Sequence, residues 1–408
     1  MYKTRNLTKS CLNTALASAL ALLTSHVFSF EAPLDGVDSD RIDWGVMMDL
    51  SGPTSASQGI WVNGFQDHMR KVNETGGVYG RKINVLTEDS RFNAATDKVN
   101  FEKLLTQTPV LGISGLGTSG AQVALAPAIK SGKVPIVATY TTTKALSEPV
   151  SPMVYGGFCG YKQMAKTGIG YFADKLKLKA PKVMTVHIES AGGVEYAEMV
   201  NETVTKLGGT ARSVSMKVTA ADVTPQVLEI LAFKPDFVTV YGVSNTSILT
   251  AKVMHQYGLK TPIFGISYLG APQIFTALGP DAGANYFFVS CFTPGGSDAS
   301  PGNKTLVEFA DKYNHSAIKE DINYVAGWVA AQIVTEALLK TGKEPTRAKL
   351  VEAMNKGFSV DTKGLSAPIV FTKDDHTGPS ILKTFNYDYA SKKFKPFGDY
   401  ADYMKYLK

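Results

Sequence analysis

Short apolar runs alternate with amphipathic stretches along most of the chain, and this alternation predicts the fold class. IDWGVMMDL, residues 42–50, predicts a buried strand, and GIWVNGFQDHMRKVNETGG after it has the spacing of a helix closed by glycines. The strand–helix pair repeats in KINVLTED and ATDKVNFEKLLTQT. Two more strands are predicted at PVLGIS and VPIVAT, on either side of a helix that begins at Ser119. Such alternation is typical of α/β proteins, in which helices cover both faces of a parallel sheet.

Two stretches interrupt the alternation and divide the chain. SPMVYGGFCGY (151–161) and GANYFFVSCFTPGGSDASPG (283–302) are rich in glycine and aromatic residues, and we interpret both as irregular. The helical patterns after the second break, at 305–314, 321–341 and 346–356, need a sheet to cover, so we expect the chain to return to the first one. The tail predicts short strands and turns. We therefore expect two lobes, each built around one sheet. Lobe 1 has residues 41–156 plus 293–361, and lobe 2 has residues 157–292 plus 362–408.

The first 29 residues have the pattern of a cleavable secretory signal. Lys3, Arg5 and Lys9 precede a short apolar core, and Val27 and Ser29 occupy the small-residue positions before the cleavage point. Cleavage after Ser29 leaves 408 − 29 = 379 residues, and the formal net charge falls from +6 to about +3. No dense basic tract remains, so nucleic-acid binding is not supported. We expect an exported protein.

A glycine-rich turn, LGISGLGTSGAQ, carries the spacing G-x-G-x-x-G at Gly115, Gly117 and Gly120. A dinucleotide site would need an acidic residue about 20 positions further on, to hold the ribose. The next strand instead ends in ATYTT, residues 138–142, without an acid. The dinucleotide interpretation is therefore disfavoured, and no cofactor is predicted.

The same turn has a second interpretation as an anion pocket. Free backbone N–H groups at a helix start, with the Ser119 hydroxyl beside them, attract an anion. Thr141 and Thr142 follow the next strand and could converge on the same place. An ordinary serine N-cap beside a threonine turn fits the pattern better, so the residues alone favour it and leave the anion pocket open.

Enzymatic and metal sites find little support in the pattern. GTSGA lacks the second glycine of a nucleophile elbow, and the histidines after residue 29 are scattered without metal-ligand spacing. We predict no catalytic residue and no metal site. Two cysteines lie outside the signal, Cys159 and Cys291, and their count permits either one disulfide or two buried thiols.

Several segments resemble one family in order and spacing. LSGPTSASQGIWVNGFQDHMRKVNETGGVYGRKINVLTEDS resembles the opening of the type I periplasmic solute-binding proteins, the leucine/isoleucine/valine-binding family of ABC importers. The resemblance continues through GLGTSGAQVALAPAIKSGKVPIVATYTTTKAL, KPDFVTVYG, GLKTPIFG and YVAGWVAAQIVTEALLKTG. It covers nearly all of the chain after the signal. It implies a two-lobed α/β fold with three crossing strands and a ligand held between the lobes.

The resemblance also implies the roles of individual residues. A serine at the position of Ser119, with Gly120 beside it, and a threonine near Thr141 and Thr142 hold the ligand carboxylate in the family. Tyr241 matches an aromatic residue that faces the cleft from the second lobe. The glycine turn is then a carboxylate cradle.

Two departures from the family pattern bear on the ligand. Amino-acid binders place an acid just after FG in the second lobe, but here GISY puts Ser267 in that region. The family often has a cleft tyrosine where this chain has Gly192, which leaves space. Because a buried ammonium without a counter-charge is expensive, we expect a carboxylate ligand without an α-amino group, such as an aromatic or other bulky organic acid. A branched-chain amino acid or amide is the alternative.

The resemblance implies a mechanism and partners. Cys159 and Cys291 fall at the two predicted crossings, where the family's strands run side by side, so we expect a disulfide between them. The protein would be a monomer that closes on a small molecule and presents it to a membrane permease, without changing it chemically. A periplasmic sensor that signals to a membrane partner is a second alternative. An enzyme acting in the same cleft is a third, without an acid–base pair to support it.

Overall fold

A five-stranded parallel sheet forms from the first third of the chain in the computed structural model, which describes residues 35–141 and 143–408. The strand order is β2-β1-β3-β4-β5, from β1 (Arg41–Met48), β2 (Lys82–Asp89), β3 (Ile113–Gly115), β4 (Ile136–Thr139) and β5 (Val154–Gly156). Its middle strands are buried on both faces, which explains their continuous apolar sequence. The predicted signal peptide lies outside the described residues.

A seven-stranded mixed sheet holds most of the remaining strands, in the order β14-β13-β10-β9-β8-β6-β7. Five strands are parallel: β6 (Lys182–Ile188), β7 (Thr210–Met216), β8 (Phe237–Tyr241), β9 (Ile263–Gly265) and β10 (Tyr286–Ser290). The tail adds β13 (Lys383–Asp388) and β14 (Lys393–Phe397) antiparallel at one edge. A separate antiparallel pair joins β11 (Phe358–Val360) to β12 (Ile369–Phe371).

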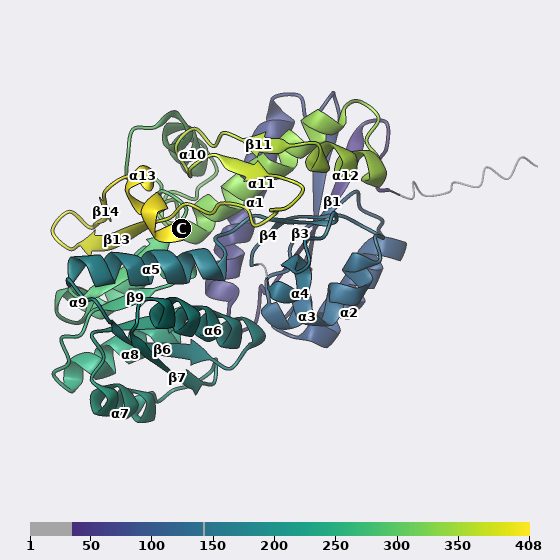
Figure 1. The fold of residues 1–408 in the computed structure, drawn as a ribbon. Helices are drawn as coiled ribbons and strands as arrows, with labels where there is room; N and C mark the ends of the chain where they lie inside the picture. The colour runs from purple at the N-terminus through teal and green to yellow at the C-terminus, as the bar shows by residue number, and fades with distance from the viewer. Residues whose placement is uncertain (1–34, 142) are drawn as a thin grey trace, which may run out of the picture. The chain divides into compact units, whose positions relative to one another are not determined.

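Helices connect the strands and cover the sheets (Figure 1). They are α1 (Ser55–Glu74), α2 (Ala94–Thr106), α3 (Ser119–Lys130), α4 (Lys144–Ser147), α5 (Tyr161–Lys175), α6 (Ala191–Lys206), α7 (Thr224–Phe233), α8 (Ser244–Gln256), α9 (Pro272–Gly283), α10 (Pro301–Lys312), α11 (Ile322–Thr341), α12 (Arg347–Asn355) and α13 (Tyr400–Tyr403). Short 3₁₀ turns follow β9 at Ser267–Leu269 and close the chain at Met404–Leu407.

Helices α1 and α11 are far apart in the sequence but pack closely in the fold (Figure 1). A Cβ on Gly64 would lie 2.0 Å from the Tyr324 carbonyl oxygen, and a Cβ on Gly327 would lie 1.9 Å from that of Trp61. Only glycine permits this approach from either helix. The contact brings the chain after residue 300 back to the helix that follows β1, as the pattern of the helices predicts.

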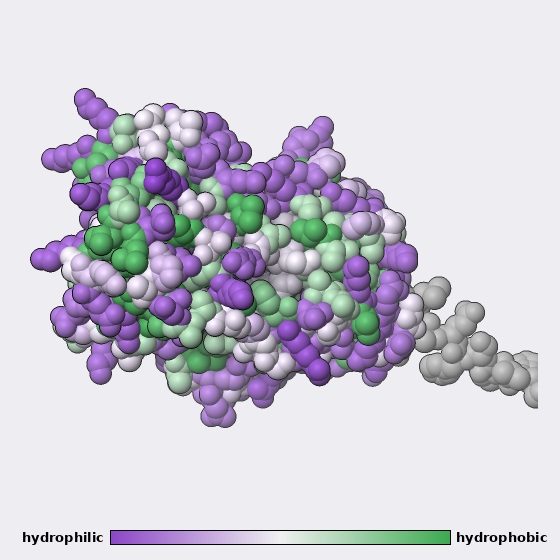
Figure 2. All heavy atoms as spheres, turned by 90° about the horizontal axis from the view of Figure 1, so that it is seen from below, coloured by the Kyte–Doolittle hydropathy of each residue, from purple (hydrophilic) through white to green (hydrophobic). Residues whose placement is uncertain are grey.

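The helix α11 is apolar almost all round, because it lies in the core. By length and composition alone it could cross a membrane, yet 78% of its most apolar window is buried inside the fold. On the face shown in Figure 2, apolar side chains form patches between polar ones. The apolar character of α11 is therefore explained by packing within the protein.

Two strands lie in the stretches that the sequence pattern assigns to irregular structure. β5 occupies part of 151–161, and β10 occupies part of 283–302. The prediction was wrong for both, because each short buried strand lies within a stretch rich in glycine and aromatic residues that hides its strand pattern. β10 is an interior strand of the larger sheet, with β9 on one side and β13 on the other.

Over the described residues, the chain passes between the two sheets three times, after β5, after β10 and before β13, and these three segments contact one another. The Gly156 N–H donates to the His376 carbonyl oxygen at 2.8 Å, and Phe292 forms an isolated bridge with Ser366. Cys159 and Cys291 are joined by a disulfide between two of these segments, with a Cα separation of 5.8 Å. The lobe boundaries 41–156 plus 293–361 and 157–292 plus 362–408 stay a prediction.

Candidate functional site

A pocket lies beyond the carboxyl ends of strands from both sheets. Its lining follows β1, β2, β3 and β4 of the first sheet and β6, β8 and β9 of the second. The residues are Thr54, Ser57, Gln58, Phe92, Gly117, Thr118, Ser119, Tyr140, Thr141, Ile188, Ser190, Tyr241, Gly242, Val243, Ser244, Tyr268 and Leu269. This is where open α/β sheets bind ligands, because the loops at that edge vary while the strands hold them.

Four helices begin at this pocket, namely α1, α3, α6 and α8. Thr54, Thr118 and Ser190 directly precede three of them, and Ser244 is the first residue of the fourth. The first N–H groups of a helix have no partner within it, and the helix dipole places about half a positive charge there. The pocket therefore favours an anion without containing a cationic side chain.

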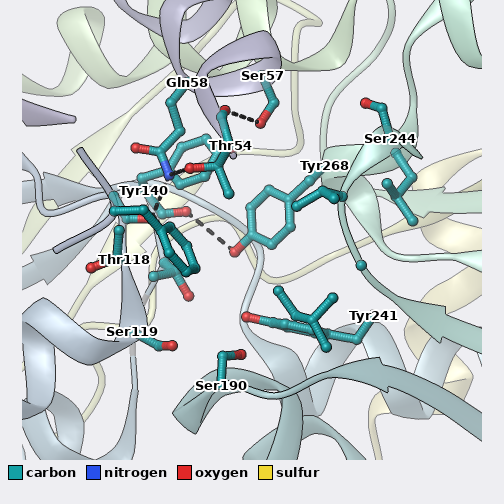
Figure 3. A pocket seen from close by; sticks show the side chains of 17 residues that line it. Thr54, Ser57, Gln58, Thr118, Ser119, Tyr140, Ser190, Tyr241, Ser244 and Tyr268 are labelled. Carbon is teal, nitrogen blue, oxygen red and sulfur yellow. Dashed lines mark hydrogen bonds between the residues drawn. The ribbon is translucent and has the colours of Figure 1, made fainter. Parts of the chain in front are cut away.

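The N-cap of α3 is Thr118, whose Oγ1 accepts the Ala121 N–H at 3.1 Å. Ser119 is thus the first helical residue, and its side chain is free for another role. No hydrogen bond joins its hydroxyl to another described residue. Figure 3 shows Ser119 and Ser190 reaching the pocket from helices of the two different sheets.

The glycine turn before α3 holds a side chain of the protein itself. Gly115 has φ +90°, a conformation that other residues rarely adopt. A Cβ on Gly117 would lie 1.8 Å from Oε1 of Gln58, so glycine lets this amide approach. Gln58 donates to the Gly117 carbonyl oxygen at 2.8 Å and accepts the Asp49 N–H at 2.7 Å. The amide therefore ties α1 to the turn.

The side-chain amide of Gln122 fixes the turns after β3 and β4. These turns carry the residues that are predicted to bind the ligand carboxylate. Gln122 donates to the carbonyl oxygens of Leu116, at 3.1 Å, and Thr141, at 2.7 Å. Its Oε1 accepts the Thr143 N–H at 2.9 Å. Because Gln122 is fully buried, these contacts hold the turn after β3 and the turn after β4 at a constant separation.

Aromatic rings fill much of the pocket. Tyr268 stacks on Tyr140 with ring centroids 4.8 Å apart and also meets Phe158 at 4.5 Å. Tyr140 donates to the Asn323 side-chain oxygen at 2.8 Å, which fixes its ring. In Figure 3 the Tyr268 ring reaches the middle of the pocket. The remaining cavity of about 50 Å³ has room for a group the size of a carboxylate.

Tyr161 closes the pocket behind Thr141 and Tyr241. The Thr141 hydroxyl donates to the Tyr161 oxygen, and the hydroxyls of Tyr161 and Tyr241 are 2.9 Å apart. Burial raises the pKa of all three tyrosines, Tyr161, Tyr241 and Tyr268, so their hydroxyls stay protonated near neutral pH. They offer neutral hydrogen bonds only.

The expectation that Gly192 widens the cleft was wrong. A Cβ at this position would lie 2.2 Å from the Tyr241 hydroxyl and 2.6 Å from the Tyr161 hydroxyl. The space that glycine leaves is therefore occupied by these two hydroxyls. Gly192 itself does not line the pocket.

The other predicted residues divide into two groups. The structure brings Ser119, Thr141 and Tyr241 together in the pocket lining, whereas Ser267 and Gly120 lie outside it, and Thr142 is outside the described residues. Ser267 is fully buried and its hydroxyl donates to Ser290 at 2.9 Å, so the next residue, Tyr268, faces the pocket instead. Gly120 is exposed on α3, one residue past the turn.

Sequence reasoning missed several lining residues that share one signal. Each lies in the turn after a parallel strand or in the first turn of the helix that follows, at most about ten residues past the strand end. The rule applied to Ser119, Thr141 and Tyr241 would have found the others at the remaining strand ends. They are Thr54, Ser57, Gln58, Thr118, Ser190, Ser244 and Tyr268.

Among the described residues that line the pocket there is no Asp, Glu, Lys, Arg or His. Over residues 35–141 and 143–408, no group of three or more His, Cys, Asp or Glu side chains could hold a metal ion. A ligand in this pocket would therefore meet hydroxyls, amides, backbone N–H groups and aromatic rings.

Behind the pocket lie the buried acids Asp49, which accepts hydrogen bonds from Thr54, and Asp97 on α2. The pKa of Asp97 is strongly raised. Burial raises its pKa to about 7, the charges of Asp49 and Asp89 act in the same direction, and the Thr118 hydroxyl opposes them. Its carboxyl oxygens have no hydrogen-bond partner of good geometry in the described part of the chain. In the unfolded chain the same group has its ordinary pKa of 3.8.

We expect Asp97→Asn to stabilise the protein at pH 8 but not at pH 4. Since the folded pKa is raised, the folded state loses stability as the pH rises from about 4 to about 7 and stays level above that. Removing the charge at pH 8 should raise the free energy of unfolding by up to about 4 kcal/mol, since each pKa unit corresponds to about 1.4 kcal/mol. Urea unfolding at both pH values measures this difference, with Asp374→Asn in an exposed turn as the control. An equal effect of Asp97→Asn at both pH values would contradict the raised pKa.

Comparison with known proteins places this fold and pocket in one family. The chain belongs to the periplasmic binding proteins, whose family model matches residues 42–388. This confirms the resemblance to the type I solute-binding proteins of ABC transporters and the two-lobed α/β fold class. Members of this family are periplasmic or extracellular, bind small molecules and work with transporter permeases. A comparison with curated protein sequences finds no match.

Solved structures with the same fold include binding proteins for different ligands. A fatty acid ABC transporter substrate-binding protein from Thermomonospora curvata is 24% identical, with a TM-score of 0.80, covering 90% of this chain and 95% of its own. A branched-chain amino acid ABC transporter protein from Thermus thermophilus with bound valine is 22% identical, with a TM-score of 0.78, covering 89% and 97%. A leucine-binding protein from Thermotoga maritima is 19% identical, with a TM-score of 0.74, covering 88% and 98%.

Proposed function

We propose that this chain is a periplasmic solute-binding protein that captures an organic acid lacking an α-amino group and delivers it to an ABC transporter permease. The observation that supports this most strongly is a pocket with helix N-termini on both sides and no charged side chain. Such a pocket stabilises a carboxylate through N–H and O–H donors. In this proposal Ser119 and Thr141 hold the carboxylate, and Tyr241 contacts the ligand from the second sheet. To donate to the carboxylate, the Thr141 hydroxyl turns away from Tyr161 and accepts the Tyr161 hydroxyl proton instead.

An α-amino acid fits this pocket poorly. Its ammonium group would enter a region that is already positive from the helix dipoles, with no carboxylate to pair with. An unpaired buried charge costs several kcal/mol, which corresponds to a factor of 100 or more in affinity. The similar structures are named for both fatty acid and amino acid ligands, so this fold accommodates both classes and the lining residues distinguish them.

The ligand is captured by closure in this proposal. Because the lining comes from the loops of both sheets, a bound ligand contacts all of it only when the two sides are together. The Glu195 carboxylate on α6 accepts the backbone N–H of Lys144, at the start of α4, at 3.1 Å. This contact joins α4, which connects β4 and β5 of the first sheet, to α6, which connects β6 and β7 of the second. It lies close to Tyr161 and would stabilise the closed form.

A thermal-shift screen tests the class of ligand. The panel contains unbranched and branched aliphatic acids, aromatic acids, the corresponding amides and the α-amino acids. A ligand at 100 times its dissociation constant adds about 2.7 kcal/mol to the free energy of unfolding, which raises the melting temperature measurably. We expect a rise with acids and not with amino acids. A rise with leucine or valine and not with any simple acid would contradict the proposal.

A further inference from the structure

We infer that Tyr161 is the end wall of the ligand pocket and limits the length of the acid that the protein accepts. This inference rests on the proposed function for the nature of the ligand. The wall itself is a matter of geometry, since a second cavity lies directly behind the ring.

Tyr161 stands between the two spaces: it contacts residues that line the ligand pocket and itself lines the cavity behind them. Its hydroxyl bonds Thr141 and Tyr241, both of which line the ligand pocket. Its own side chain lines the neighbouring cavity, a groove whose other lining residues include Lys144, Glu148, Lys162, Glu195 and Glu202. Glu148, Lys162 and Glu202 are exposed, so the far side of this groove faces solvent. The ring is 3% exposed and stands at the start of α5, so it fills the space between the two.

The two spaces differ greatly in size. The ligand pocket has a volume of about 50 Å³, and the cavity behind Tyr161 has about 280 Å³. A ligand that extends from Ser119 toward Tyr161 therefore ends at the ring, although more room lies beyond it. A single side chain separates the acid site from the larger groove.

Gly192 makes the wall possible. Both tyrosine hydroxyls lie where its Cβ would be, so any larger residue would displace one of them. The ring of Tyr161 also meets that of Tyr241 edge to face, with centroids 5.4 Å apart. These contacts hold the ring across the end of the pocket.

Substitutions of Tyr161 test the wall with a series of unbranched alkanoic acids from three to ten carbons. Isothermal titration gives the affinity of each acid for the wild type, Tyr161→Ala and Tyr161→Phe. We expect Tyr161→Ala to move the best-bound length up by at least two carbons, with about a fourfold gain for each methylene group that is buried in the space the ring vacates. Carbons that reach the charged groove beyond should add little affinity. Tyr161→Phe keeps the ring and should keep the wild-type length. Tyr171→Ala, on the same helix but away from the pocket, controls for general effects of removing a tyrosine ring.

A second variant and a crystal structure test the role of Tyr161 further. If Tyr161→Ala does not fold, Tyr161→Leu removes the far end of the side chain and should lengthen the preferred acid by a smaller amount. A crystal structure of the folded variant shows whether the pocket and the cavity have joined, whatever ligand the protein binds. An unchanged length preference, or two cavities that stay separate, would overturn the wall. Failure of the wild type to bind any acid, with the cavities joined in the variant, would instead overturn the proposed ligand class.

Discussion

Replacing Ser119 with aspartate is expected to weaken ligand binding by about a thousandfold. The new carboxylate would stand at the first position of α3, facing the place where the ligand carboxylate is proposed to bind. Two like charges about 4 Å apart repel by about 4 kcal/mol at the effective dielectric constant of a protein surface. The fold should tolerate the change, because an acid in the first turn of a helix interacts favourably with its dipole.

Ser119→Asn is the matched control for this experiment. Asparagine has nearly the shape of aspartate but no charge, so it should cost about tenfold or less. Titration calorimetry of both variants with the acid found in the screen separates the effect of charge from that of size. Equal affinities of the aspartate and asparagine variants would show that the ligand carboxylate does not lie at the start of α3.

Removing the disulfide is expected to lower the free energy of unfolding by about 2–5 kcal/mol. Cys159 and Cys291 are 132 residues apart, and a crosslink that closes so long a loop strongly restricts the unfolded chain. Both cysteines are buried where segments pass between the sheets, so the loss should also loosen the packing there. Denaturant unfolding of the double variant Cys159→Ala, Cys291→Ala measures the change.

Reduction of the wild-type protein is the control for the disulfide prediction. It breaks the same crosslink without changing any side-chain volume, so the stability of the reduced protein should match that of the double variant. Before reduction, a thiol reagent added to the unfolded chain from residue 30 onward should find no free thiol. Two free thiols, or a stability that does not respond to reductant, would contradict the prediction.

The sequence pattern predicts the fold well where apolar runs alternate regularly with amphipathic stretches. This alternation in the first 140 residues gives the parallel sheet directly, including the short buried strands β3 and β4. It fails at β5 and β10, which are also short and buried but lie within stretches rich in glycine and aromatic residues. Such strands are recognised by their neighbours in a sheet, and a sequence does not show which strands are neighbours.

The candidate site is less predictable than the fold. Ser119 and Thr141 could be found because a glycine turn and a strand end mark them in the sequence. The position of Tyr268 depends on a short 3₁₀ turn that points Ser267 inward and its neighbour into the pocket. Likewise, the absence of a side chain at Gly192 suggests empty space, but Tyr161 from another helix fills it. Only packing between segments distant in sequence decides these two cases.

The central claim is tested most directly by titrating the protein with pairs of acids that differ only in the α-amino group. 4-Methylpentanoate and leucine form one pair, and 3-phenylpropanoate and phenylalanine form the other. The uncharged pocket predicts that at least one simple acid binds 100-fold or more tightly than its amino acid partner at pH 7. Tighter binding of leucine or phenylalanine than of the matching acid would contradict the account, because it would require a counter-charge for the ammonium group that this pocket lining does not contain.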